Sequence, residues 1–134
     1  MEKYALVTGG SRGIGRSICV QLAGMGYHLL INYKGNEAEA LNTKLLCEEK
    51  GVKAEIMKFD VASKAEIEAS LGQWITDSGK EKVIEILVNN AGVRQDTLLS
   101  FMSDEQWNTV LDTSLQGMFY VTRMVLNPML MNRY

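Results

Sequence analysis

The chain has 134 residues, which is enough for a single domain with one hydrophobic core. A hydrophobic content of 46% with 22% charged residues excludes a disordered or low-complexity chain, and no internal repeat is present. The 14 basic and 16 acidic residues are scattered along the chain, so the charge pattern indicates neither nucleic acid nor an anionic membrane as a partner.

The first predicted strand covers residues 4–7 and runs directly into a glycine-rich turn. The turn reads Thr8-Gly9-Gly10-Ser11-Arg12-Gly13-Ile14-Gly15. Glycine adopts turn conformations that a Cβ disfavours, and it lets an anion approach backbone N–H groups. A helix that begins near Gly13 would point its positive end at such an anion. The spacing G-x-x-x-G-x-G therefore predicts a phosphate-binding turn, and the alternative is an ordinary glycine loop.

The remaining elements alternate between helix and strand. We predict a helix from Gly13 that is stopped by Gly26, a strand at 29–31, a helix at 37–50 and a strand at 53–59. A third helix follows, which is opened by Ser63 and Glu66 and closed by Gly79, and then a strand at 84–88. The last helix is opened by Ser103 and Gln106, and its pattern fades near Pro128. The predicted inner faces are Ile14, Ile18, Leu22 and Met25 in the first helix, Ala38, Leu41 and Leu45 in the second, Ile67, Leu71, Trp74 and Ile75 in the third, and Trp107, Val110, Leu111, Leu115, Met118, Thr122 and Val125 in the last.

This order of elements predicts an α/β fold. Right-handed crossovers make the sheet parallel and doubly wound, with helices on both faces and the strand order 3-2-1-4. The order reverses between strands one and four, so a ligand is expected at the carboxyl ends of these two strands.

A second motif, Asn89-Asn90-Ala91-Gly92, follows the fourth predicted strand. Together with Thr8-Gly9-x-x-x-Gly13-Ile14-Gly15, it resembles the short-chain dehydrogenase/reductase family, and within it most of all the bacterial 3-oxoacyl-[acyl-carrier-protein] reductases. The resemblance implies a Rossmann-like fold of which residues 1–134 are the NADP-binding portion, ending before the fifth strand. It implies NADPH-dependent reduction of a 3-oxoacyl-[acyl-carrier-protein] to the 3-hydroxyacyl form in fatty acid biosynthesis. The alternatives are another short-chain alcohol or ketone oxidoreductase and a noncatalytic nucleotide-binding module.

The end of the second strand, Asn32-Tyr33-Lys34, indicates which nicotinamide cofactor is bound. Dinucleotide folds that use NAD commonly place an acid here to bind the ribose 2′-OH. No acid occupies this stretch, and Lys34 and Arg12 are both placed to neutralise a 2′-phosphate. NADPH is therefore the predicted cofactor, unless Lys34 is only a solvated turn residue.

By resemblance, the cofactor site combines the glycine turn, the ends of the second and third strands and the loop after the fourth. Its members are Gly9, Gly10, Ser11, Arg12, Gly13, Ile14, Tyr33, Lys34, Asp60, Val61, Asn90, Ala91 and Gly92. Asp60 would accept a hydrogen bond from the adenine amino group and Val61 would donate its backbone N–H. The alternative for Asp60 is a turn or capping acid, and Asn89 is expected to be structural.

Catalysis in the family depends on a serine and a Tyr-x-x-x-Lys pair. The chain contains no Tyr-x-x-x-Lys, so we expect the 134 residues alone to be inactive. The family usually has Asp-Thr-Asn-Leu on the last helix, where the asparagine holds a water of the proton relay, and this chain has Asp112-Thr113-Ser114-Leu115. Ser114 is a candidate for that role. The alternative is a serine bonded to its own helical turn.

The resemblance also implies protein partners. Arg133 matches an arginine that docks acyl carrier protein in the related reductases, although a cation at a helix end is also favoured by the helix dipole. The family assembles as homo-oligomers, usually tetramers, and the last helix helps to build the dimer. Met118, Met124, Met129 and Met131 are accordingly predicted to lie in the core or at a subunit interface.

Neither the cysteines nor the histidine predicts a chemical site. Cys19 and Cys47 lack a C-x-x-C spacing, so we expect both to be buried small hydrophobic residues. His28 begins a strand and is assigned no chemistry, and no cluster of His, Cys or acids predicts a metal site. No apolar run is long enough for a signal segment or a membrane span, and we expect a cytoplasmic protein.

Overall fold

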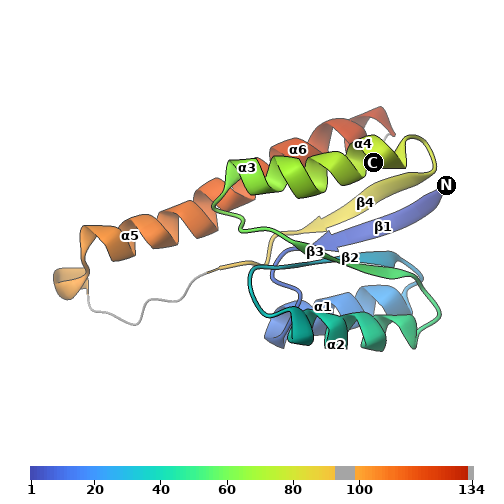
Figure 1. Ribbon diagram of the computed structural model, residues 1–134, viewed down its shortest axis with the longest axis horizontal. Helices are drawn as coiled ribbons and strands as arrows, with labels where there is room; N and C mark the ends of the chain where they lie inside the picture. Colours follow the sequence, from blue (N-terminus) through green and yellow to red (C-terminus); the bar gives the residue numbers. More distant parts are fainter. Residues whose placement is uncertain (93–98, 133–134) are drawn as a thin grey trace.

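The computed structural model describes residues 1–92 and 99–132, with only the backbone of Leu99. These residues form a four-stranded parallel sheet in the order β3-β2-β1-β4, as predicted. Figure 1 shows α1 and α2 covering one face of this sheet, while α3, α4 and α6 cover the other. The chain therefore has the doubly wound, Rossmann-like architecture that its alternating elements predict.

The elements have the following bounds. They are β1 Glu2–Val7, α1 Gly13–Gly24, β2 His28–Tyr33, α2 Glu37–Glu48, β3 Ala54–Lys58, α3 Lys64–Ile67, a π-helical stretch Glu68–Gly72, α4 Gln73–Ser78, β4 Lys82–Val88, a 3₁₀ turn Leu99–Phe101, α5 Asp104–Leu111, a second π-helical stretch Asp112–Gln116, and α6 Gly117–Met131.

β1 is a central strand whose side chains alternate between two cores. Tyr4 and Leu6 belong to the core under α3, α4 and α6, whereas Ala5 and Val7 belong to the core under α1 and α2. The pairing with β4 contains an irregularity at Glu85, because Tyr4 pairs with Ile84 but Ala5 pairs with Ile86. Both faces of β1 are covered, which explains why its sequence is a continuous apolar run.

The predicted inner faces of α1 and α2 were largely wrong. In α1 the buried residues are Gly15, Cys19 and Ala23, while Ile18 and Leu22 are partly buried and Ile14 and Met25 are exposed. In α2 the buried residues are Ala40, Thr43 and Cys47, and the predicted Ala38, Leu41 and Leu45 are exposed. Small side chains face the sheet because these two helices approach it closely, so the larger aliphatic side chains point outward.

Both cysteines are buried, as predicted. Burial raises the pKa of the Cys19 thiol to about 12, and it raises the pKa of Cys47 to about 11. Neither thiol is reactive in this state, since only the thiolate is a good nucleophile.

The helical segments on the other face follow the prediction in part. Ile67 and Leu71 are buried, and Trp74 and Ile75 pack against the same core, so the third predicted helix is confirmed. In the last helix Val125 is buried as predicted, but most of the predicted face is rotated: Gly117 and Val121 are also buried, whereas Trp107, Leu115 and Met118 are exposed. α6 also continues through Pro128 to Met131 instead of fading there.

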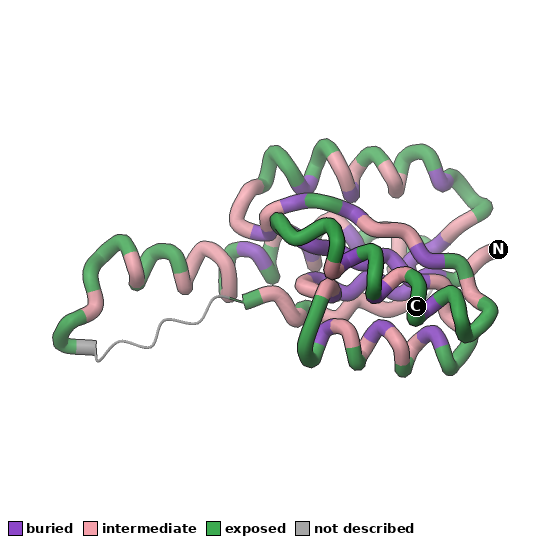
Figure 2. Tube along the Cα trace, turned by 60° about the horizontal axis from the view of Figure 1, so that its bottom comes forward, coloured by how far each residue is buried: buried purple, intermediate pink, exposed green. Residues whose placement is uncertain are grey.

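Two features explain the rotation of this last helix. A Cβ on Gly117 would lie 2.9 Å from Val61, so α6 touches the loop after β3 at this point and buries the residues one and two turns further on. α5 extends beyond the sheet and none of its residues is buried, which leaves Trp107 without a core to enter (Figure 2).

The predicted helix starts have different outcomes. At α5 the capping box is complete, because Ser103 Oγ accepts from Gln106 N at 3.1 Å and Gln106 Oε1 accepts from Ser103 N at 2.9 Å. At α3 Ser63 Oγ accepts from Glu66 N at 3.2 Å, but the Glu66 carboxylate accepts from Asp60 N at 3.3 Å instead of from Ser63 N. Within the described ranges, no helix is both long and apolar enough to cross a membrane.

Candidate functional site

The glycine turn joins β1 to α1. Gly9 and Gly13 have φ of 66° and 58°. A Cβ on Gly15 would lie 2.1 Å from Gly9 O, so only glycine lets α1 pack so closely against the turn. Arg12 is the N-cap of α1 and makes no side-chain capping bond, and the first turn of α1 contains no acid. The N-terminal N–H groups of α1 are thus available to an anion.

Thr8 connects this turn to the loop after β4. Its Oγ1 accepts from Asn90 N and from Ala91 N, each at 3.0 Å. Asn90 Nδ2 in turn donates to Gly9 O at 3.1 Å. Asn89 instead donates to Thr122 Oγ1 on α6 at 3.1 Å. The two sequence motifs therefore form one hydrogen-bonded unit at the reversal of strand order, where a ligand site is expected.

Asn32 anchors the turn from the other side, and the sequence analysis did not assign it this role. Its side chain is 2% exposed, and its Oδ1 accepts from Gly9 N at 3.1 Å. Its Nδ2 donates to Phe59 O at 3.0 Å and to Met57 O at 3.3 Å. The sequence does contain a signal for this role, which is an amide at the end of an apolar strand, because a buried amide needs several hydrogen-bond partners.

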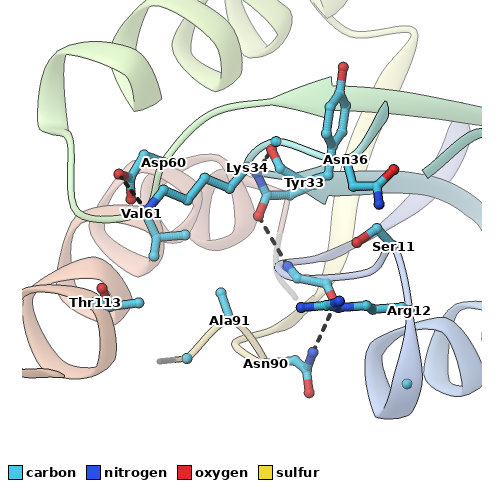
Figure 3. A pocket seen from close by; sticks show the side chains of 15 residues that line it. Ser11, Arg12, Tyr33, Lys34, Asn36, Asp60, Val61, Asn90, Ala91 and Thr113 are labelled. Atoms are coloured by element: carbon cyan, nitrogen blue, oxygen red, sulfur yellow. Dashed lines mark hydrogen bonds and ion pairs between the residues drawn. The ribbon is translucent and has the colours of Figure 1, made fainter. Parts of the chain in front are cut away.

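A cavity of about 480 Å³ opens between these elements (Figure 3). All the residues predicted for the cofactor site line it except Gly10 and Ile14. A Cβ on Gly10 would meet Cys19 and Ile31, so this glycine faces the core, and the Ile14 side chain is 74% exposed. The cavity is also lined by residues that were not predicted, namely Asn32, Gly35, Asn36 and Thr113.

Among the described residues, two cations and one carboxylate line this cavity. Lys34 Nζ is 3.5 Å from Asp60 Oδ2, and the Lys34 side chain is 73% exposed. Asp60 Oδ1 also accepts from Ala62 N at 2.9 Å, so Asp60 stabilises its own turn while it lines the cavity. Figure 3 shows Lys34 reaching toward Asp60, with Arg12 further away beside Ser11. Burial, together with the nearby Glu37 carboxylate, raises the pKa of Tyr33 above its ordinary value.

Ser114 does not line the large cavity. It lies on the π-helical stretch Asp112–Gln116 and lines a separate cavity of about 40 Å³ together with Thr8, Asn89 and Ala91. Its neighbour Thr113 lines both cavities. Single π-helical turns inside α-helices often occur at functional sites.

Arg133, the candidate for docking a carrier protein, lies outside the described residues. Across the part of the chain that the structure describes, no group of three or more His, Cys, Asp or Glu side chains could hold a metal ion.

The family of the chain follows from a comparison with known proteins. The model of the short chain dehydrogenase family matches residues 3–134, and the chain therefore belongs to this family. It is 39% identical over 133 residues to the 3-oxoacyl-[acyl-carrier-protein] reductases FabG of Staphylococcus epidermidis and Staphylococcus aureus, which covers 99% of the chain and 53% of each relative. It is 41% identical over 122 residues to an acetoacetyl-CoA reductase of Rhizobium meliloti, which covers 91% of the chain and 47% of the relative. The chain thus spans about half the length of the curated relatives it matches.

Proposed function

We propose that residues 1–134 form the NADPH-binding portion of a cytoplasmic reductase that converts a 3-oxoacyl-[acyl-carrier-protein] to its 3-hydroxyacyl form in fatty acid biosynthesis. The observation that carries this proposal is the cavity at the uncapped N-terminus of α1, with Arg12 and Lys34 beside it and no acid at the end of β2. The reductases from the two Staphylococcus species suggest the substrate, because their printed names specify a carrier-bound 3-oxoacyl group.

The residues around the cavity fit a phosphorylated dinucleotide. Gly9, Gly13 and Gly15 keep side chains away from the turn. The N–H groups of Gly9 and Gly10 already donate to Asn32, so the N–H groups that follow Gly10 would bind the pyrophosphate. Arg12 and Lys34 would hold the 2′-phosphate. Asp60 and Val61 would bind the adenine.

The other side of the cavity would hold the nicotinamide half of the cofactor. Asn90, Ala91 and Gly92 would line the ribose, where Thr8 fixes the loop. When bound, NADPH supplies the hydride that reduces a ketone. Ser114 would hold a water of the proton relay near this loop, since its small cavity shares Ala91 with the large one.

The motif that carries the family's proton donor has no match in these 134 residues. Since the chain contains no Tyr-x-x-x-Lys, we propose that it binds the cofactor but does not turn over substrate alone. A spectrophotometric assay with NADPH and a 3-oxoacyl thioester tests this. Turnover by material of verified mass would contradict it.

A second candidate substrate is a 3-oxoacyl group on coenzyme A, because another relative is an acetoacetyl-CoA reductase. A substitution of Arg133 would distinguish the two substrates, since an arginine that docks an acidic carrier protein would make no contact with a small thioester. In protein read from its full coding sequence, Arg133→Glu should weaken reduction of a carrier-bound substrate much more than reduction of a free thioester. Equal loss on both substrates would remove the docking role. If the protein read from its full coding sequence reduced only another ketone, it would be another short-chain oxidoreductase. If that protein bound the cofactor without any activity, it would be a noncatalytic nucleotide-binding module.

Cofactor choice is tested by fluorescence titration of the 134-residue chain with NADPH and with NADH. We expect NADPH to bind more tightly, and Lys34→Asp to weaken NADPH binding by about tenfold, because one charge-assisted contact is replaced by repulsion. NADH binding should change little. Lys50→Asp is the matched control, since Lys50 is exposed in the turn that follows α2 and does not line the cavity. Equal affinities for both cofactors would rule out the phosphate site.

A further inference from the structure

Arg16, in the first turn of α1, links the glycine turn to α2. Its Nη2 lies 2.6 Å from Ser11 O and 2.7 Å from Glu39 Oε2, and its Nε lies 3.0 Å from Thr43 Oγ1. The Thr43 hydroxyl is itself 3.1 Å from Ser11 O. Two side chains from two helices thus converge on one carbonyl oxygen of the turn.

The burial of Thr43 marks this contact as specific. The buried residues of α2 are Ala40, Thr43 and Cys47, and Thr43 is 0% exposed. A buried hydroxyl is costly unless it is hydrogen-bonded, so valine would be the simpler residue if the position served only packing. Here the hydroxyl accepts from Arg16 Nε, and its own proton has two acceptors within reach, Ser11 O at 3.1 Å and Glu39 O of its own helix at 3.3 Å. Ser11 O is the nearer of the two.

The hydrogen bonds to Ser11 O fix the direction of the Arg12 N–H group. The peptide bonds of the described residues are trans, and a trans peptide points its C=O and its N–H in opposite directions. Ser11 and Arg12 line the cavity, whereas Arg16 and Thr43 do not. With the Ser11 oxygen held on the α2 side, the Arg12 N–H is directed away from α2.

We propose that Arg16 and Thr43 are positioning residues, which orient the Ser11–Arg12 peptide so that the Arg12 N–H donates to a phosphate of the bound cofactor. The inference rests on the proposed function for the identity of the ligand. Arg16 acts through the turn and not as a second anion-binding charge, because its guanidinium is already paired with the Glu39 carboxylate.

The decisive variant is Thr43→Val, which removes the hydroxyl while keeping the shape and the charge of the site. NADPH titration of the 134-residue chain should show binding about three- to tenfold weaker, since a single phosphate contact is misdirected. Thr43→Ser should restore the affinity, because it restores the hydroxyl. Arg16→Met should weaken NADPH binding by a similar factor. The double variant, Arg16→Met with Thr43→Val, should bind NADPH no more weakly than the weaker-binding single variant, because both residues act on one carbonyl.

A spectroscopic readout separates positioning from general stability. In ¹⁵N NMR spectra of the free chain, Thr43→Val should shift the Arg12 amide resonance, and added inorganic pyrophosphate should move this resonance in the unmodified chain but much less in the variant. Each variant is measured at a temperature at which urea titration shows it fully folded.

Each result decides the proposal. Unchanged NADPH affinity in Thr43→Val overturns it, and so does a loss confined to Arg16→Met that disappears at high salt, because Arg16 would then act by charge. If the unmodified chain does not bind NADPH, the proposed function fails, and the pyrophosphate titration still decides the positioning role. The positioning role is also overturned if the Arg12 amide resonance responds to pyrophosphate equally in the unmodified chain and in Thr43→Val.

Discussion

Lys34 Nζ and Asp60 Oδ2 lie 3.5 Å apart, so an ion pair connects the ends of β2 and β3 at the cavity. The proposed cofactor makes a different demand on each partner, because Lys34 would bind the 2′-phosphate while Asp60 would bind the adenine. The carboxylate would therefore compete with the phosphate for the same cation, and it would also repel the phosphate.

Replacement of Asp60 by asparagine should increase the preference for NADPH over NADH. Asparagine keeps an oxygen for the adenine amino group but removes the charge that engages Lys34. Exposed ion pairs contribute about 0.2 to 1 kcal/mol, so the ratio of the two dissociation constants should rise by roughly 1.4- to fivefold. Titration of both cofactors measures this ratio, and Glu49→Gln is the control, because Glu49 is an exposed acid that does not line the cavity. An unchanged ratio would show that the ion pair does not influence cofactor choice.

Gly15 should not tolerate alanine. Its Cβ would lie 2.1 Å from Gly9 O and 2.6 Å from Asn90 Nδ2, so the turn and the loop after β4 would both have to move. Overpacking of this kind costs about 1 to 3 kcal/mol or more, and urea denaturation measures the loss. Gly24→Ala is the matched control at the end of the same helix, because a Cβ there meets nothing within 4 Å. Equal stability of the two variants would contradict the packing argument.

Asn32 should be essential to stability because of its side-chain amide. Asn32→Leu has a similar volume but leaves Gly9 N, Phe59 O and Met57 O without their side-chain partner. Unsatisfied buried groups cost about 1 to 3 kcal/mol each, so the free energy of unfolding should fall by at least about 2 kcal/mol. Asn42→Leu on the exposed face of α2 should change stability by less than about 0.5 kcal/mol. If both variants were equally stable in urea, the anchoring role of Asn32 would be wrong.

The sequence predicts the strand order and most of the candidate site because these depend on local pattern. Continuous apolar runs identify parallel strands, and the motifs at 8–15 and 89–92 directly follow two of them. Asn32, Arg16 and Thr43 could not be assigned in this way, because each has a decisive partner at least 23 positions away: Gly9 for Asn32, Glu39 for Arg16 and Ser11 for Thr43. Local patterns also do not reveal how closely a helix approaches its sheet. For this reason Leu45 was predicted to be buried and is 60% exposed.

The chain should self-associate through the exposed side chains of α6 and its preceding turn. Leu115, Met118, Phe119 and Leu126 are exposed, and Met118, Phe119 and Leu126 line a hollow of about 410 Å³. Contiguous exposed apolar surface favours association, and β4 is the edge of the sheet in the described residues. Light scattering should therefore show a species larger than a monomer, and Phe119→Asp should shift it toward the monomer. Leu45→Asp on α2 is the control, and a clean monomer before any substitution would refute the prediction.

The bond between Thr8 and Asn90 joins residues 82 positions apart, and this separation orders events during folding. β1 and the glycine turn leave the ribosome early, yet the turn lacks its Asn90 contact until β4 has been synthesised and has paired with β1. Closing so long a loop is slow compared with forming a helix. A nascent chain that ends before β4 is consequently not expected to capture the cofactor, and any protection that NADPH gives against proteolysis should begin only after the fourth strand has joined the sheet.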